Sequence, residues 1–319
     1  MVEEFGLLVD RFFEGDRFAL SKLISVVERN SPESLKILAD ISKRSKRTIF
    51  DSSFQVIGIT GAPGVGKSTI ISALLPNLRK RGFRVGVLLC DPSSVKSQGG
   101  AILGDRIRIK TIEEDEGVFV RSAGTRGERG GISINTSDIL NLFVFFGFDK
   151  IIVETAGTGQ SETEISNFTD TLVLAISPES GDEIQFMKAG ILELADIIVI
   201  NKSDRPGADN IFNDIKSSLE ISKHISPHNW DIPVIKMVAK DGEGVSELIA
   251  ALSAHMEYIK NSELAKKRVK RAEYDFTNFV LRYVRSRVLS SEVFLKEVQL
   301  ILQGKKDVYS SAYEVIKSI

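Results

Sequence analysis

The chain has 319 residues, of which 42% are hydrophobic and 27% are charged. These proportions are typical of a soluble globular protein and exclude a disordered or collagen-like chain. Its 42 basic and 43 acidic residues leave a net charge of -1, so no global charge favours nucleic acid or an anionic membrane. A single cysteine, Cys90, excludes an internal disulfide framework. Without a membrane-spanning run or a targeting segment, we expect a cytoplasmic protein with no membrane or nucleic-acid partner.

Residues 1–50 predict a helical extension. Apolar residues between Phe18 and Val27 recur at helical spacing after Gly15-Asp16. Ser31-Pro32 has the pattern of an N-cap followed by proline at the first helical position. We find no candidate chemistry in this extension.

Residues 51–260 alternate short apolar runs with amphipathic stretches. The expected strands are Gln55–Thr60, Arg84–Cys90, Val118–Arg121, Lys150–Glu154, Thr171–Ile176, Asp196–Ile200 and Pro233–Met237. The expected helices are Lys67–Arg81, Ile134–Phe146, Glu183–Leu194 and Val245–Ile259. Most strands are apolar on both faces, as a parallel sheet covered by helices on each side requires. The alternation predicts a doubly wound, mostly parallel α/β domain that binds ligands at the carboxyl ends of its strands.

Residues 261–319 return to a helical pattern. An apolar stripe spaced by three and four residues is formed by Val269, Ala272, Phe276, Val280, Tyr283 and Val284. Two further helices are expected, one around Ser291–Leu302 and one reaching Ile319. This C-terminal helical arm has no obvious core of its own. Its stripe must therefore pack on the α/β domain or on another subunit.

A complete phosphate-binding loop follows the first expected strand. Its residues are Gly61, Ala62, Pro63, Gly64, Val65, Gly66, Lys67 and Ser68. The glycines let consecutive N–H groups point at a phosphate, and the N-terminus of the following helix adds its partial positive charge. We expect Lys67 to reach the β- and γ-phosphates, Ser68 to coordinate Mg²⁺, and Thr69 to contact the nucleotide. The loop therefore predicts binding of a nucleoside triphosphate.

The segment Asn201-Lys202-Ser203-Asp204 ends a later strand and resembles the guanine-reading loop of GTPases. The Asp204 carboxylate would accept hydrogen bonds from N1–H and the 2-amino group of guanine, whereas adenine has no donor at N1. Lys202 would lie along the base, and Asn201 would brace the phosphate loop. GTP or GDP is therefore favoured over adenine nucleotides. Further nucleotide contacts are expected from Val238, Ala239 and Lys240.

Two other expected strands end close to an acidic residue, Asp91 after the second strand and Glu154 at the end of the fourth. A carboxylate at such a position can hold Mg²⁺ directly or through its waters, or it can instead cap a helix. Gly157, three residues after Glu154, can offer its N–H to the γ-phosphate. Asp105 lies in a glycine-rich stretch that is well placed to be a mobile switch.

Several of these motifs occur in an order that resembles one known family. The segments are Gly61–Ser68, Asp91–Ser94, Gly99–Asp105, Glu154–Glu162, Gly181–Gln185 and Asn201–Asp204. Together they resemble the MeaB/ArgK family of P-loop GTPases, and Gly15–Leu20 resembles the helical prefix of that family. The resemblance covers nearly the whole chain and is weakest after residue 261. The segment Glu154–Glu162 is highly specific because most GTPases have Asp-x-x-Gly there, although Ala156 and Thr158 replace the usual valines.

The resemblance implies a Mg²⁺-dependent GTPase that acts as a chaperone for a coenzyme-B12-dependent acyl-CoA mutase, chiefly methylmalonyl-CoA mutase. Such proteins gate the loading of adenosylcobalamin and protect or repair the mutase. The resemblance also implies Ser68 as a direct Mg²⁺ ligand, with Asp91, Asp105 and Glu154 around the ion and its waters. It further implies that Ser177–Lys188 is a third switch loop and that the C-terminal arm forms a homodimer.

Two residues are candidates for driving hydrolysis. Gln160 could orient a water and Lys188 could stabilise charge on the γ-phosphate, or either could only hold a switch in place. A kinase that passes the γ-phosphate to an amino-acid-transport binding protein is one alternative function, but the sequence contains no visible acceptor site. A metal-insertion GTPase is another. One cysteine and three scattered histidines argue against it, because nickel-inserting relatives carry segments rich in these residues.

Overall fold

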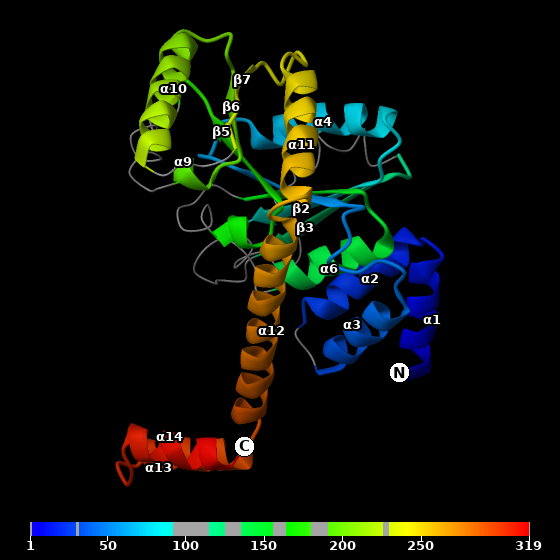
Figure 1. Ribbon diagram of the computed structural model, residues 1–319. Helices are drawn as coiled ribbons and strands as arrows, with labels where there is room; N and C mark the ends of the chain where they lie inside the picture. The colour runs from blue at the N-terminus through cyan, green and yellow to red at the C-terminus, as the bar shows by residue number, and fades with distance from the viewer. Residues whose placement is uncertain are drawn as a thin grey trace. The chain divides into compact units, whose positions relative to one another are not determined.

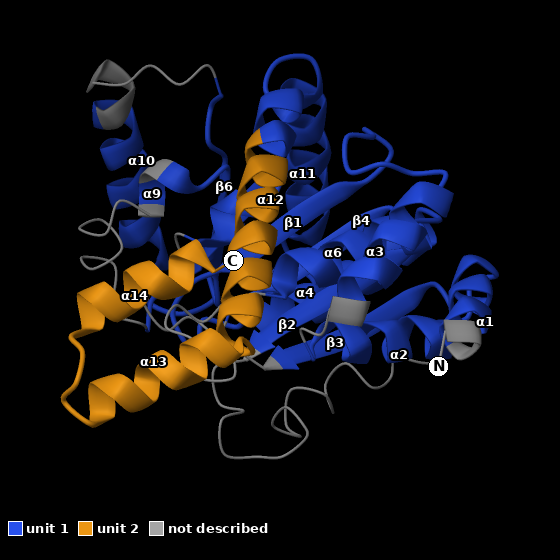
Figure 2. Cartoon of the chain, turned by 90° about the horizontal axis from the view of Figure 1, so that it is seen from below, with its two compact units in different colours: residues 1–269 blue, residues 270–319 orange. Residues whose placement is uncertain are grey.

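The computed structural model describes residues 2–29, 32–91, 115–124, 135–155, 164–179, 191–225 and 230–318. The chain divides into two compact units, residues 1–269 and residues 270–319 (Figure 2). Within the described residues, no helix is both long and apolar enough to cross a membrane.

The first unit is built on one sheet of seven parallel strands. They are β1 (Gln55–Thr60), β2 (Val85–Asp91), β3 (Val118–Gly124), β4 (Lys150–Glu154), β5 (Thr171–Ile176), β6 (Ile197–Asn201) and β7 (Val234–Met237). Their order across the sheet is β3-β2-β4-β1-β5-β6-β7. The predicted doubly wound parallel sheet is therefore confirmed. The bounds of β1, β4 and β5 are those expected from the sequence, and the other four differ only near their ends.

Helices cover both faces of this sheet, which is why every residue of β1, β5 and β6 is buried. Figure 1 shows α4 (Lys67–Lys80) and α11 (Val245–Lys260) on one face and α6 (Thr136–Phe146) on the other. The apolar sides of α4 and α11 join the strands in one continuous core. The strands of the sheet therefore share one apolar core with α4 and α11.

One helix of the structure is missing from the sequence-based prediction. α10 (Ala208–Ile225) connects β6 to β7 and buries Ala208, Ile211 and Ile215 against them. The spacing of three and four residues between these positions is the signal that could have found it. α9 (Ile191–Leu194) is the part of the predicted helix Glu183–Leu194 that lies within the described residues.

The predicted helical prefix consists of α1 (Val2–Phe13), α2 (Arg17–Val27) and α3 (Pro32–Arg44), which lie beside α6 (Figure 1). Asp16 caps α2, because its Oδ1 accepts hydrogen bonds from the amides of Phe18 (2.7 Å) and Ala19 (3.3 Å). The Phe18 side chain, by contrast, is exposed to solvent. The prefix packs through aromatic contacts such as Phe12 with Phe146, whose ring centroids are 5.2 Å apart.

The second unit consists of the continuation of α12 (Leu264–Leu289), followed by α13 (Glu292–Leu302) and α14 (Val308–Lys317). α13 and α14 pack side by side, and Lys306 of their connection donates to Glu297 at 2.9 Å. The apolar stripe expected on α12 is exposed in this structure, with Phe276 at 70% and Val280 at 44%.

The strand order decides where a ligand can bind. β1 lies between β4 and β5, and the chain winds from β1 towards β2 on one side but crosses from β4 to β5 on the other. The carboxyl end of β1 is therefore the position at which doubly wound sheets open a ligand-binding crevice.

Candidate nucleotide-binding site

The phosphate loop connects β1 to α4 at the carboxyl edge of the sheet. Gly61, Gly64 and Gly66 have φ angles of +144°, +83° and +94°, which L side chains rarely adopt. A Cβ on Gly61 would stand 2.1 Å from the carbonyl oxygen of Ala175 at the end of β5. The close approach of β5 therefore demands glycine at the first position of the loop.

Lys67 opens α4 and its side chain folds back over the loop. Its Nζ donates to the carbonyl oxygens of Gly61 at 2.8 Å and Ala62 at 3.1 Å, and the residue is only 6% exposed. Phosphate oxygens entering the loop would offer this ammonium charged acceptors, which form stronger hydrogen bonds than neutral carbonyls. The structure thus places the ammonium within the phosphate loop, and its contact with the β- and γ-phosphates stays a prediction.

Ser68 and Glu154 bring two oxygen ligands together beside the loop. Parallel pairing places Glu154 of β4 next to Ile59 of β1, and Ser68 Oγ donates to Glu154 Oε1 at 2.8 Å. Hydroxyl and carboxylate oxygens are ligands that Mg²⁺ prefers, so this pair fits a magnesium site. Asp91 ends β2, but its side chain lies outside the described part of the structure, and so does all of Asp105.

Asn201 ties three loops together at the ends of β1, β6 and β7. Its Nδ2 donates to the carbonyl of Val65 in the phosphate loop at 2.8 Å, and its Oδ1 accepts from the amide of Ala239 at 3.1 Å. The side chain is almost fully buried, so both hydrogen bonds lie away from water. The phosphate loop, the base-reading loop and the segment after β7 therefore form one connected surface.

Glu179, which sequence analysis did not single out as a site residue, lies beside the base-reading loop. Its carboxylate pairs with Lys202 Nζ at 2.8 Å and with Arg205 Nη1 at 3.1 Å. These two cations lower the pKa of Glu179, first through the Lys202 hydrogen bond and then through the charge of Arg205. The backbone of Lys202 has a positive φ of 56°. The Asp204 side chain is exposed to solvent. The position of Glu179, just past the carboxyl end of β5, is the sequence signal that could have identified it.

Comparison with known proteins identifies the family. The model of one family, described as Methylmalonyl Co-A mutase-associated GTPase MeaB, matches residues 20–293. The chain belongs to the MeaB family. It is 38% identical to a protein of Pyrococcus horikoshii named as a GTPase, over 98% of this chain and 97% of that protein. It is 33% identical to the mouse methylmalonic aciduria type A homolog, mitochondrial, over 82% of this chain and 66% of that protein.

A solved structure supports the fold of this MeaB-family chain. The crystal structure of a LAO/AO transport system kinase aligns with a TM-score of 0.69, covering 98% of this chain and 96% of the other. At 23% sequence identity, the likeness concerns the fold alone. The predicted family and fold are both confirmed.

The residues predicted for the site of this MeaB-family protein divide into two groups. The structure brings together the phosphate loop with Thr69, the Mg²⁺ candidates Ser68 and Glu154, the base-reading loop, and Val238, Ala239 and Lys240 at the end of β7. Gly157, Gln160 and Lys188 lie outside the described residues. The first group lies at one end of the sheet because its members stand at the carboxyl ends of four parallel strands, β4, β1, β6 and β7.

Proposed function

We propose that this chain hydrolyses GTP to GDP and phosphate with the help of Mg²⁺, and that this hydrolysis serves a coenzyme-B12-dependent acyl-CoA mutase. The contacts of the Asn201 side chain are the observation that supports a guanine nucleotide as the ligand. This side chain joins the phosphate loop to the Asn-Lys-Ser-Asp segment, so that one bound molecule can meet both. The description of the family as mutase-associated supports the mutase as the partner.

Each described residue has a role that follows from its position. The N–H groups of the phosphate loop and the N-terminus of α4 would hold the β-phosphate, and Lys67 would neutralise charge on the β- and γ-phosphates. Mg²⁺, held by Ser68 and Glu154 with Asp91 and Asp105 as further candidates, would supply charge neutralisation between the phosphates. Asp204 would accept from guanine while Lys202 lies along the base.

The hydrolytic step itself is assigned to two candidates. We propose that Gln160 orients the attacking water or that Lys188 stabilises the developing charge, with the Gly157 amide directed at the γ-phosphate. A slow rate in the isolated protein suits a switch whose hydrolysis belongs to the complex with its partner.

The proposed partner role is to gate adenosylcobalamin loading and to protect or repair the mutase. Membership of a family described as methylmalonyl-CoA mutase-associated supports this role, as does the similarity to the mouse methylmalonic aciduria type A homolog. The exposed apolar stripe of α12 supports a homodimer formed through the C-terminal arm. We also propose a cytoplasmic location, which the single, buried cysteine fits.

The test is steady-state GTP hydrolysis with and without a B12-dependent acyl-CoA mutase from the same source. We expect a low basal rate that rises at least about tenfold with the mutase, a change of about 1.4 kcal/mol in the activation barrier. ATP should not replace GTP, and Lys67→Ala should abolish turnover because it removes the phosphate-binding ammonium.

Three other outcomes would contradict parts of the proposal. A GTPase rate that the mutase leaves unchanged, together with no complex, would remove the mutase as partner. Equal turnover of ATP would remove the guanine assignment. Transfer of labelled γ-phosphate to a protein rather than to water would favour the kinase alternative.

A further inference from the structure

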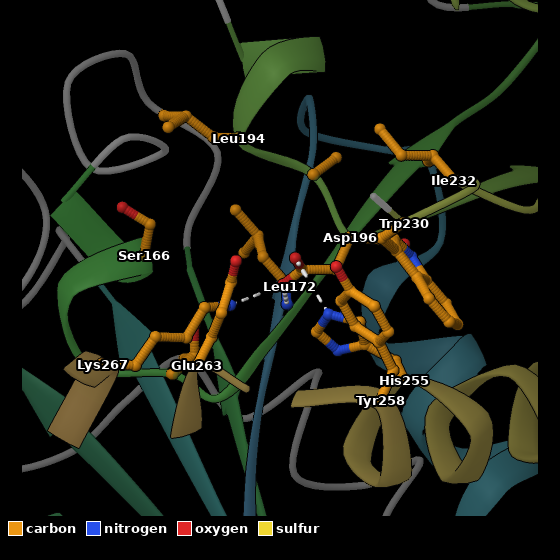
Figure 3. Close-up of a pocket in the computed structure, with 12 residues that line it drawn as sticks. Ser166, Leu172, Leu194, Asp196, Trp230, Ile232, His255, Tyr258, Glu263 and Lys267 are labelled. Carbon is orange, nitrogen blue, oxygen red and sulfur yellow. Dashed lines mark hydrogen bonds and ion pairs between the residues drawn. The ribbon is translucent and has the colours of Figure 1, made fainter. Parts of the chain in front are cut away.

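A pocket lies at the amino ends of the strands, on the opposite side of the sheet from the strand ends that carry the candidate nucleotide site. It has a volume of about 230 Å³ and lies where β5, β6 and β7 begin, whereas the phosphate loop and the base-reading loop follow strands at their carboxyl ends. Figure 3 shows Glu263 from the turn before α12 and Lys267 from the first turn of α12, with His255 and Tyr258 from α11. All of its lining residues belong to the first unit.

A chain of hydrogen bonds ends at two residues that line the pocket, His255 and Asp196. Lys150 donates to Gln55 Oε1 at 2.8 Å, and Gln55 Nε2 donates to Thr171 Oγ1 at 2.9 Å. Thr171 Oγ1 lies 2.9 Å from His255 Nδ1, and His255 Nε2 lies 3.2 Å from Asp196 Oδ1. The Asp196 carboxylate can only accept, so the Nε2–H of His255 is the donor in that contact. His255 thus links the Thr171 hydroxyl to the Asp196 carboxylate.

Asp196 is held as an anion whose oxygens are already occupied. Burial alone would raise its pKa, but the hydrogen bond from His255, the charge of Lys267 and the amide of Leu172 together lower it. Its Oδ2 accepts from the Leu172 amide at 2.8 Å and from Lys267 Nζ at 3.4 Å. The charges of Asp196 and Lys267 therefore balance each other, and this pair offers an incoming ligand no net charge.

The second carboxylate of the pocket is that of Glu263. Among the described residues, neither this carboxylate nor the Tyr258 hydroxyl has a hydrogen-bond or ion-pair partner. Glu263 is exposed, so its charge stands at the mouth of the pocket rather than in its floor. The mouth is therefore negative and supplies acceptors.

The walls of the pocket are aromatic and aliphatic. The Trp230 ring lies 5.1 Å from that of Tyr258 and 4.9 Å from that of His255, measured between centroids. Trp230 is fixed by its Nε1, which donates to the carbonyl of Asp196 at 2.8 Å. Leu172 and Ile232 add apolar surface. Aromatic faces beside an unpaired carboxylate form the combination that attracts organic cations.

We propose that this pocket binds a small organic cation, a protonated amine carrying a planar apolar group. The ammonium would face Glu263 at the mouth, and the apolar group would lie against Trp230. The volume of about 230 Å³ corresponds to roughly seven or eight water molecules and suits one ring with a short side chain, far less than a nucleotide. An anion would meet the Glu263 charge with only the already paired Lys267 to attract it.

The chain contains one tryptophan, so the intrinsic fluorescence of Trp230 reports directly on this pocket. The full-length protein, saturated with GDP to block the nucleotide site, is titrated with benzylamine, benzyl alcohol and benzoate. These probes share a ring and differ in charge. We expect a saturable change with benzylamine, binding at least about tenfold weaker with benzyl alcohol, and none with benzoate.

A matched pair of variants tests the assigned carboxylate. Glu263→Gln should weaken benzylamine binding at least about tenfold, because it removes the charge that faces the ammonium. Glu257→Gln, an exposed position on α11 outside the pocket, should leave the affinity unchanged. Equal binding of all three probes, no saturable binding of benzylamine, or an unchanged affinity in Glu263→Gln would each overturn the proposal. Neither glutamate takes part in GTP hydrolysis, so this outcome is independent of the proposed function.

Discussion

The glycines of the phosphate loop differ in what surrounds them, although all have positive φ angles. A Cβ on Gly66 would lie 2.4 Å from Nδ2 of Asn201, the residue that joins the phosphate loop to the base-reading loop. A Cβ on Gly64 would meet nothing within 4 Å. Comparing alanine substitutions at the two positions therefore distinguishes the effect of backbone strain from the effect of losing the Asn201 contact.

We expect Gly66→Ala to weaken GDP binding by at least about tenfold more than Gly64→Ala does. Both variants bear the left-handed backbone cost, about 1–2 kcal/mol, but only Gly66→Ala displaces the Asn201 amide. Isothermal titration calorimetry of the two variants beside the wild-type chain measures the difference. Equal losses of affinity would mean that the Asn201 contact does not contribute to nucleotide binding.

Cys90 illustrates how burial changes the chemistry of a single residue. It lies in β2 and is only 3% exposed, and burial raises the pKa of its thiol to about 12. The thiol is therefore protonated at neutral pH and behaves as a small apolar side chain.

At the scale of elements, the start of α12 is fastened to the sheet by Arg268. Its guanidinium is 2% exposed and pairs with the Asp170 carboxylate through Nε at 3.1 Å and Nη2 at 3.0 Å. It also donates to the carbonyls of Asp51 and Phe54 and stacks over the Phe54 ring at 4.0 Å. One arginine thus links α12 to the segments that precede β1 and β5.

We expect Arg268→Met to lower the free energy of unfolding by about 3–5 kcal/mol, because it leaves the Asp170 carboxylate buried without its partner. Urea unfolding measures the loss. Lys266→Met, two residues earlier and exposed, is the control and should change stability by less than about 0.5 kcal/mol.

The double variant Arg268→Met with Asp170→Asn should recover part of the loss, since no unpaired charge then remains buried. If Arg268→Met proves as stable as the Lys266→Met control, the ion pair does not anchor α12. No recovery in the double variant would assign the loss to packing of the arginine instead of its charge.

At the scale of the whole molecule, the apolar stripe of α12 is exposed to solvent, which favours its burial against another protein chain. Phe276, Val280 and Tyr283 follow each other at intervals of four and three residues, so they share one helix face. Tyr283 is 47% exposed. A contiguous apolar face of this kind typically marks an interface between protein chains.

We expect the wild-type chain to sediment as a dimer and Val280→Glu to sediment as a monomer, because a charge in the centre of the stripe cannot be buried unpaired. Sedimentation velocity of both proteins at equal concentration measures this. Arg285→Glu changes charge at an exposed position of the same helix outside the stripe and should leave the dimer intact. A monomeric wild-type chain would refute dimerisation through this face.

The sequence by itself determined the family, the sheet and the positions of the binding motifs. Glycine spacing in the phosphate loop and apolar runs such as β1 and β5 are local patterns whose physical meaning does not depend on the rest of the chain. α10 was missed although the spacing of Ala208, Ile211 and Ile215 is that of an amphipathic helix. The roles of Gln160 and Lys188 in hydrolysis remain predictions, since both residues lie outside the described part of the chain.

Only the tertiary structure decided which distant side chains meet. Gln55, Thr171 and His255 are separated by 116 and 84 residues along the chain, yet they form one line of hydrogen bonds. They meet because β1 pairs with β5 rather than with β2, the strand that follows it in sequence. Glu179 meets Lys202 for a similar reason, since β5 and β6 are neighbours in the sheet. Such pairings depend on the strand order. That order is set when all the strands are buried together in one sheet, so no single segment of the sequence contains a pattern that reveals it.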